Sequence, residues 1–318
     1  MANPACSDQE FMKLFDQLGA RKLATHLDIR ERAVYSRRRS LEARLGVALS
    51  PPSYGPSNFL KFPGRNSIEI KNGTIIVGSD LHIWPGEQST CLRALKKFIK
   101  DIQPTAVILN GDVMDFPRIS RHPQNWESAP DPQEEIEAAQ DHLNDMVLAC
   151  KRGARKIWTI GNHDLRFEAS IANALPQFRG IKGVHLSDHF PNWEKAMSCM
   201  VNEGVEGGAT MIKHRFKGGM NATRANALNA GISMVTGHLH SQNVRPISDY
   251  SRFDRYGVDT GCVADKEHRA FTYVEDSPLD WRSGFALLTY RDSRLMYPEL
   301  VTKWDDKTVQ FRGALHRV

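Results

Sequence analysis

The sequence has no long apolar run. None approaches the roughly 18 residues that a membrane-spanning helix needs, and Met1 to Glu10 lack the basic-then-apolar pattern of a secretory leader. We therefore expect a cytoplasmic protein with no membrane partner. With 41% hydrophobic and 25% charged residues among 318, the composition is that of a globular protein with a large core.

Cysteine is also scarce. The five cysteines are odd in number and scattered, and none is in a Cys-x-x-Cys pair. This pattern excludes both a disulfide framework and a thiolate metal site. Any metal in this protein should therefore be bound by nitrogen and oxygen ligands.

Acidic residues are few in one stretch near the N-terminus. Between Ala20 and Leu45 there are eight basic residues and three acidic ones, a local excess of +5, which equals the net charge of the whole chain. The remainder is close to neutral. This asymmetry predicts a segment that faces a polyanion and is attached to a separate domain.

The same basic stretch has helical periodicity. Phe11, Leu14, Phe15 and Leu18 recur at helical spacing before Gly19, a second helix is expected from about Ala20 to Leu27, and a third carries Val34, Leu41 and Leu45. Arg21 to Leu45 resembles a helix-turn-helix DNA-binding domain, although Asp28 replaces the usual turn glycine. The resemblance implies DNA contacts by Arg32, Tyr35, Arg38 and Arg39. The alternative is a small helical cap with solvated arginines.

Three regions follow from composition and pattern. We predict a basic helical domain at 1–50, a Pro/Gly-rich linker at 51–66 and a catalytic domain at 67–318. In the third region strands (74–78, 105–110, 156–160) alternate with helices (about 89–101 and 133–152), which predicts a mainly parallel sheet. The strands expected after Ala209 (209–213, 232–236, 256–260, 284–290, 299–303 and 308–311) predict a second, mixed sheet packed on the first.

Short polar motifs follow the apolar runs. They are Asp80-x-His82, Gly111-Asp112-x-x-Asp115, Gly161-Asn162-His163-Asp164, a lone His214, and Gly237-His238-x-His240. Each follows a run that should be a core strand, and such strand ends are where α/β sheets build their sites. Alternate residues of an extended segment face the same way, so each Asp-x-His or His-x-His pair can reach one ion. The motifs therefore predict a metal site.

These five motifs, in this order, resemble the calcineurin-like metallophosphoesterase family over about residues 74–263. The resemblance implies a four-layer αββα sandwich of two mixed sheets and two divalent ions. Asp80, His82, Asp112 and His240 would hold the first ion, and Asp112, Asn162, His214 and His238 the second. Nitrogen and oxygen ligands without cysteine favour manganese, iron, zinc or magnesium, and of these we expect manganese.

The resemblance also implies the chemistry. Metal-bound hydroxide would attack a phosphodiester in line, and His163 would act as general acid, oriented by Asp115. Asp164 should support the loop. Phe116 stands where the protein phosphatase branch of the family has a phosphate-clamping arginine, which argues against that branch.

Two basic groups are candidates for phosphate binding: Arg118, Arg121 and Arg166, then Arg215 and Lys217. Either group could instead be solvated surface. We expect a DNA phosphodiesterase, with a phosphodiesterase or phosphatase for a nucleotide or other small phosphoester as one alternative and a DNA-binding regulator with a structural phosphoesterase body as another. A helix-turn-helix joined to this body resembles proteins of bacteriophage or prophage DNA metabolism, which places it in a bacterial or phage-infected cell.

Overall fold

The computed structural model describes residues 6–49, 62–120, 129–250, 252–274 and 279–318. The chain divides into two compact units, Met1–Lys61 and Phe62–Val318. Most of the predicted linker, residues 51–61, lies outside the described residues, and its last residue already belongs to a strand, β1 (Asn66–Ile68). No helix in the described ranges is both long enough and apolar enough to cross a membrane.

The first unit contains the three predicted helical segments. Helix α1 (Asp8–His26) is interrupted at Gly19, whose φ of 69° breaks the helix into two, and α2 (Glu31–Leu45) follows a short turn. In that turn Asp28 has φ 51°, while the Ile29 N–H donates to the Ala24 carbonyl. This is the left-handed turn that glycine usually supplies at a helix end, and aspartate tolerates it. Buried apolar side chains from all three segments form one small core: Phe11, Phe15, Leu23, Val34 and Leu41.

The second unit is built on two sheets. Nine of the described strands form the first sheet, in the order β15-β14-β13-β11-β2-β3-β4-β5 with β12 beside β11. Their bounds are β2 Gly73–Gly78, β3 Ala106–Leu109, β4 Arg155–Thr159, β5 Glu194–Ala196, β11 Gly284–Arg291, β12 Arg294–Leu295, β13 Glu299–Lys303, β14 Thr308–Phe311 and β15 Ala314–Arg317. The second sheet has the order β1-β6-β7-β8-β10-β9, with β6 Cys199–Val201, β7 Thr210–Ile212, β8 Ser233–Thr236, β9 Asn243–Ile247 and β10 Arg255–Asp259.

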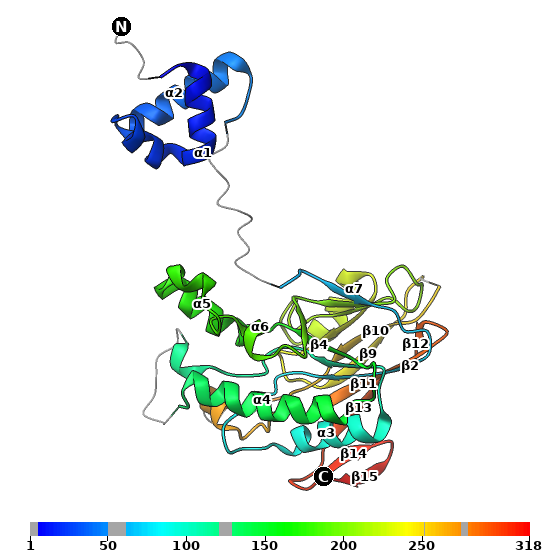
Figure 1. The fold of residues 1–318 in the computed structure, drawn as a ribbon. Coiled ribbons are helices and arrows are strands. Elements are labelled where there is room, and N and C mark those ends of the chain that lie inside the picture. Colours follow the sequence, from blue (N-terminus) through cyan, green and yellow to red (C-terminus); the bar gives the residue numbers. More distant parts are fainter. Residues whose placement is uncertain (1–5, 50–61, 121–128, 251, 275–278) are drawn as a thin grey trace. The chain divides into compact units, whose positions relative to one another are not determined.

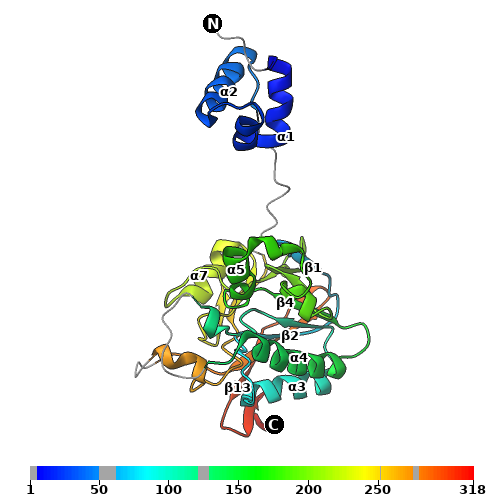
Figure 2. The ribbon, with the colours of Figure 1, turned by 60° about the vertical axis from the view of Figure 1, so that its left-hand side comes forward.

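Helices cover the outer face of each sheet. In Figure 1, α3 (Thr90–Ile102) and α4 (Pro132–Ala149) run together along one side of this unit, and α7 (Ala222–Ala230) lies on the opposite side of the strands. Figure 2 shows the same separation from another direction. Shorter helical segments connect the strands: α5 Asp164–Ala174, α6 Leu186–His189, and the 3-10 turns η1 Pro117–Ile119, η2 Pro176–Gly180 and η3 Arg269–Val274.

The central strands are buried on both faces, as the four-layer arrangement requires. In β2, Ile76 packs into the core beneath α3 and α4, whereas Ile75 and Val77 belong to the core between the sheets. Alternate residues of a strand face opposite sides, so one apolar run supplies both cores. The predicted αββα sandwich of two mixed sheets is confirmed.

The prediction for the late strands is wrong in one respect. Strands β11, β13 and β14 join the first sheet, where β11 pairs antiparallel with β2, and the second sheet takes β1 and β6 from before residue 209. Strand β11 is apolar on both faces, with Phe285 in one core and Ala286 in the other, so it fits a central place beside β2. The pattern of apolar residues identifies a strand that is buried on both faces, but it does not identify the strand that pairs with it.

The predicted strand-end motifs do follow strands, and these strands end together. Strands β2, β3 and β4 are parallel, with Gly78 opposite Leu109 and Leu109 opposite Trp158. In the second sheet β7 and β8 are also parallel. The loops that leave their carboxyl ends are therefore brought to one region, and they carry the polar motifs.

Candidate metal centre

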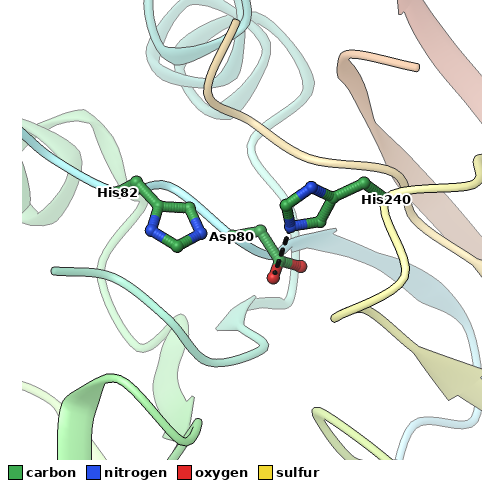
Figure 3. A group of neighbouring side chains, drawn as sticks. All are labelled: Asp80, His82 and His240. Carbon is green, nitrogen blue, oxygen red and sulfur yellow. Dashed lines mark ion pairs between the residues drawn. The ribbon is translucent and has the colours of Figure 1, made fainter. Parts of the chain in front are cut away.

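The first group of candidate ligands is Asp80, His82 and His240. One potential ligand atom from each lies within 4.8 Å of the others, and all three side chains are buried. Figure 3 shows the two imidazoles on either side of the Asp80 carboxylate, with His240 Nε2 3.1 Å from Asp80 Oδ1. Asp80 and His82 come from the loop after β2, and His240 from the loop after β8.

The second group is Asp112, His214 and His238, whose potential ligand atoms also lie within 4.8 Å of one another. His214 Nε2 is 3.0 Å from Asp112 Oδ2, and its other ring nitrogen, Nδ1, lies 2.8 Å from the Asn110 carbonyl oxygen. That contact orients the ring so that Nε2 faces the carboxylate. His214 is buried and His238 is exposed, so this group opens toward solvent at His238.

Several buried polar atoms in this region lack a hydrogen-bond partner within the described chain. Among the seven predicted ligands, Asn162 Oδ1 accepts no hydrogen bond from the described residues, and Asp80 Oδ1 and His214 Nε2 make only the ion-pair contacts with His240 and Asp112 given above. Buried polar groups are nearly always hydrogen-bonded. Carboxylate, amide and imidazole atoms left in this way are also the donors that divalent cations bind. The residues present therefore fit the two metal ions that the motifs imply.

The electrostatics of the metal-free chain agree with a cation site. Burial alone would raise the pKa of Asp112, but the charges of His214, His163 and His82 hold it well below its usual range. Burial would lower the pKa of His214, but Asp112 and Asp80 raise it to about 10. The carboxylates are thus ionised and one histidine is protonated at neutral pH, so a metal ion binding to His214 must displace that proton.

A third cluster connects His163 to the first group. His163 Nδ1 lies 2.5 Å from Asp115 Oδ1, and His82 Nδ1 lies 3.1 Å from the same oxygen. Asp115 thereby orients both rings and leaves the Nε2 atom of His82 for a ligand role. Burial would lower the pKa of His163, but its contact with the Asp115 carboxylate and the charge of Asp112 raise it.

Arg166 lies beside the other face of this cluster. Its Nη2 is 3.2 Å from His163 Nε2, and its Nη1 donates to the Asp115 carbonyl at 2.8 Å. Of the predicted phosphate-binding residues, this one reaches the centre of the site.

The other predicted phosphate-binding residues are placed differently. Arg118 donates to the Ala129 carbonyl at 2.8 Å and pairs with Asp131 at 2.7 Å. Arg121 lies outside the described residues. Arg215 is exposed directly after His214, and Lys217 Nζ donates to Asn229 Oδ1 at 2.9 Å.

Asp164 supports the loops more extensively than its motif position indicates. Its buried carboxylate accepts hydrogen bonds from four donors: the backbone N–H groups of Asp112, Val113 and Gly161, and the indole N–H of Trp158. It therefore joins the loop after β3 to the loop after β4. Burial and the charge of Asp112 raise the pKa of Asp164 to about 6.

Glu135 was not predicted as a site residue. It comes from α4, is fully buried, and accepts hydrogen bonds from the backbone N–H groups of Asp115 and Phe116 at 3.1 and 2.8 Å. Burial raises the pKa of Glu135 to about 8. The available signal was an acidic residue in line with the buried helix positions Ala139 and Leu143.

Five candidate ligands have left-handed backbone conformations. Their φ values are 54° at Asp80, 40° at His82, 50° at Asp112, 69° at His238 and 57° at His240. Such conformations are uncommon outside glycine and concentrate at functional sites.

The glycine at 161 has a different role, because a Cβ there would collide with the Asp112 side chain and backbone. Gly161 allows the loops after β3 and β4 to approach each other closely.

The predicted DNA-contacting residues lie on α2. Arg32, Tyr35 and Arg39 are exposed, and their spacing of three and four places them on one face of the helix. Arg38 is partly buried, with its Nε 2.9 Å from Glu42 Oε1 and its guanidinium over the Phe15 ring. These residues line a surface groove together with the acidic Glu31 and Glu42.

The αββα fold and the groups of candidate metal ligands are those expected of a metal-dependent phosphoric ester hydrolase. The profile of the calcineurin-like phosphoesterase family matches residues 73–254, more than half of the chain, and the chain belongs to that family. It is therefore a hydrolytic phosphoesterase of a family that uses divalent metals.

The relatives found by sequence come from bacteriophages. The Gene 54 protein of Mycobacterium phage D29 is 28% identical over 246 residues, and that of Mycobacterium phage L5 is 26% identical over 251 residues; each alignment covers 71% of this chain and 92% of the relative. Among solved structures, wild-type Vps29 complexed with zinc, from Entamoeba histolytica, aligns with a TM-score of 0.40 and 13% identity, over 77% of this chain and 98% of that one.

Proposed function

We propose that this protein is a dimetal phosphodiesterase that hydrolyses DNA. The observation that carries the reaction type is the pair of buried Asp115 and partly exposed His163 directly beside two groups of candidate ligands. Asp80, His82, Asp112 and His240 would hold one divalent ion, and Asp112, Asn162, His214 and His238 the other. When bound, such ions supply Lewis-acid activation of the phosphoryl group and lower the pKa of water to near neutrality.

Residues of the chain itself then protonate the leaving group. The Asp115 carboxylate pairs with His163 Nδ1 at 2.5 Å, which favours the protonated imidazole and fixes its orientation. His163 Nε2 is the atom available to donate a proton to the departing oxygen, and a general acid in this role contributes about 10²- to 10⁴-fold. Arg166, beside that nitrogen, is placed to contact the phosphate.

The exposed face of α2 supports DNA as the substrate. Arg32, Tyr35 and Arg39 present two exposed basic groups and an aromatic ring on one helix face, the combination used to contact phosphates and bases. A small phosphoester is the second candidate, because three other arginines of this unit are engaged within it. Arg37 and Arg44 pair with Asp8, and Arg38 with Glu42.

The test compares three substrates with manganese added: single-stranded DNA, double-stranded DNA and bis-p-nitrophenyl phosphate. We expect the full-length protein to cleave DNA and His163→Ala to lose about 10²- to 10⁴-fold in kcat while its metal content stays near normal. Turnover of the small ester without DNA cleavage would favour the second candidate. Tight DNA binding with no turnover would favour a regulator.

The contribution of α2 is tested separately. The double variant Arg32→Ala/Arg39→Ala should weaken DNA binding and reduce its salt dependence, while hydrolysis of the small ester is unchanged. Lys13→Ala is the control, because Lys13 is an exposed basic residue on the first helical segment. Equal effects of the α2 variant and the control would contradict a DNA-contacting role for that face.

A further inference from the structure

An aromatic cluster adjoins the first ligand group, and the proposed reaction does not use it. The Trp281 ring lies with its centroid 4.3 Å from that of His240, at an interplanar angle of 71°. Phe271 packs against both, at 5.0 Å from Trp281 and 5.2 Å from His240, and it also lies 4.9 Å from His82. Two of the three residues in the first ligand group thus have aromatic neighbours.

The cluster has an inner and an outer member. Phe271 is only 4% exposed, so it is a packing residue that supports the two histidines. Trp281 is partly exposed. A ring needed only to support His240 could be buried in the same way, whereas a partly exposed indole next to a reaction centre offers a flat apolar surface to a substrate.

The backbone holds Trp281 in this place. The Arg282 N–H donates to the His240 carbonyl at 2.8 Å, and the Cys262 N–H donates to the Arg282 carbonyl at 3.1 Å. The residue after Trp281 is therefore tied both to the loop that carries His240 and to the segment that follows β10. These bonds fix the indole relative to the candidate ligands, so stacking on it would require little rearrangement.

The opposite ligand group has different neighbours. His214 is followed by Arg215 and Phe216, both exposed, and the Lys213 and Lys217 ammonium groups each lie 5.8 Å from the Phe216 ring centroid. The His240 end of the site thus has an aromatic cluster, whereas the His214 end has basic side chains around one exposed aromatic ring, Phe216. If a phosphodiester bound between these ends, one of its substituents would lie toward Trp281. The charged backbone that continues from its other side would lie toward Arg215.

We propose that Trp281 is a base-stacking residue, and that the substrate is a nucleic acid strand whose base next to the cleaved phosphodiester lies on the indole. This inference rests on the proposed hydrolysis of DNA and specifies how the substrate is held. Stacking on an aromatic side chain tolerates any base, since every base has a π-face. Trp281 would therefore select for a nucleotide substituent without selecting a sequence.

The experiment uses the full-length protein and a short single-stranded oligonucleotide with manganese. A matched set of oligonucleotides carries a tetrahydrofuran abasic residue at each position in turn, which keeps the phosphodiester and removes one base. The proteins are wild type, Trp281→Ala, Trp281→Phe and Trp304→Ala, a change of an exposed tryptophan in the turn between β13 and β14. For each pair, kcat/KM at the mapped cleavage position and the metal content are measured.

We expect Trp281→Ala to lower kcat/KM on the intact oligonucleotide by about 5- to 150-fold, the range for loss of one base–aromatic stack. Removing the base next to the cleaved bond should lower wild-type activity by a similar factor and have no further effect on Trp281→Ala. Trp281→Phe should keep most of the activity, and Trp304→Ala should behave as wild type.

Three results would contradict this proposal in distinguishable ways. If Trp281→Ala loses the same factor on intact and abasic oligonucleotides, Trp281 acts only by supporting His240, and a fall in metal content would show the same. If wild type cleaves DNA without regard to the missing base, the stacking role fails and the proposed function stands. If wild type cleaves no DNA, both fail.

Discussion

Replacement of Asp164 tests whether its carboxylate joins the two catalytic loops. Asp164→Ala leaves four buried donors without an acceptor: three backbone N–H groups and the Trp158 indole. At about 1 kcal/mol for each donor, the low end of the usual range, the free energy of unfolding falls by about 4 kcal/mol. For a domain of this size, that corresponds to a Tm lower by about 8 to 16 °C.

Asp164→Asn is the matched variant. Oδ2 accepts three of the four bonds and Oδ1 accepts the one from Val113, so an amide oxygen in the Oδ2 position keeps three and loses one. We expect a loss of about 1 kcal/mol, partly offset because the amide removes a buried charge near Asp112.

Tryptophan fluorescence during urea unfolding is the assay, because all six tryptophans follow residue 61 and report on the second unit alone. If Asp164→Ala is destabilised by less than about 1 kcal/mol, the four bonds do not hold the loops. If Asp164→Asn loses as much as Asp164→Ala, charge rather than the number of accepted bonds decides the stability.

Three other outcomes follow from the site. Asp112→Asn should lower the amount of bound metal and reduce kcat by at least about 10²-fold, because one oxygen of the proposed bridging carboxylate becomes an amide nitrogen. Normal turnover with two metals bound would refute the bridging role. Burial raises the pKa of Glu135 from 4.5 to about 8, so its stabilising effect is complete below about pH 4.5 and is lost as pH rises to about 8. In chelator-treated protein, Glu135→Gln should therefore gain stability relative to wild type between those limits, and a difference independent of pH in urea unfolding would contradict this. Adding manganese at about 100 times its dissociation constant should raise the free energy of unfolding by about 2.7 kcal/mol, and an unchanged midpoint would mean that no metal binds the folded state preferentially.

The sequence was sufficient for the fold class and for the position of each motif along the chain. Apolar runs marked the strands, and the polar residues directly after them were brought together because parallel strands share one edge for their carboxyl ends. The strand ends predicted a shared metal site, and the resemblance to the metallophosphoesterase family then assigned His82, Asp112 and His240, which are far apart in sequence, to one ion. In the structure Asp80, His82 and His240 offer ligand atoms within 4.8 Å of one another, and Asp112 does so with His214 and His238.

Hydrogen bonds and ion pairs between residues far apart in the sequence could not be predicted in the same way. Glu135 and Asp164 act through hydrogen bonds to backbone groups, and no residue type marks a backbone donor in a sequence. The basic excess of the first unit was likewise counted correctly, yet Asp8 pairs with both Arg37 and Arg44 in the fold. A charge count gives the sum over a segment, whereas a contact surface depends on which charges remain exposed.

Backbone strain connects the fold to the proposed chemistry. A residue other than glycine in the left-handed region costs about 1 kcal/mol or more, and Asp80, His82, Asp112, His238 and His240 all adopt it. Several such costs together are comparable with the whole stability of a domain, so other contacts must hold these loops. Asp164 holds the backbone at Asp112, and the Asp80 carboxylate accepts the His238 N–H at 2.9 Å. The side chain of one candidate ligand thus also holds the strained backbone of another.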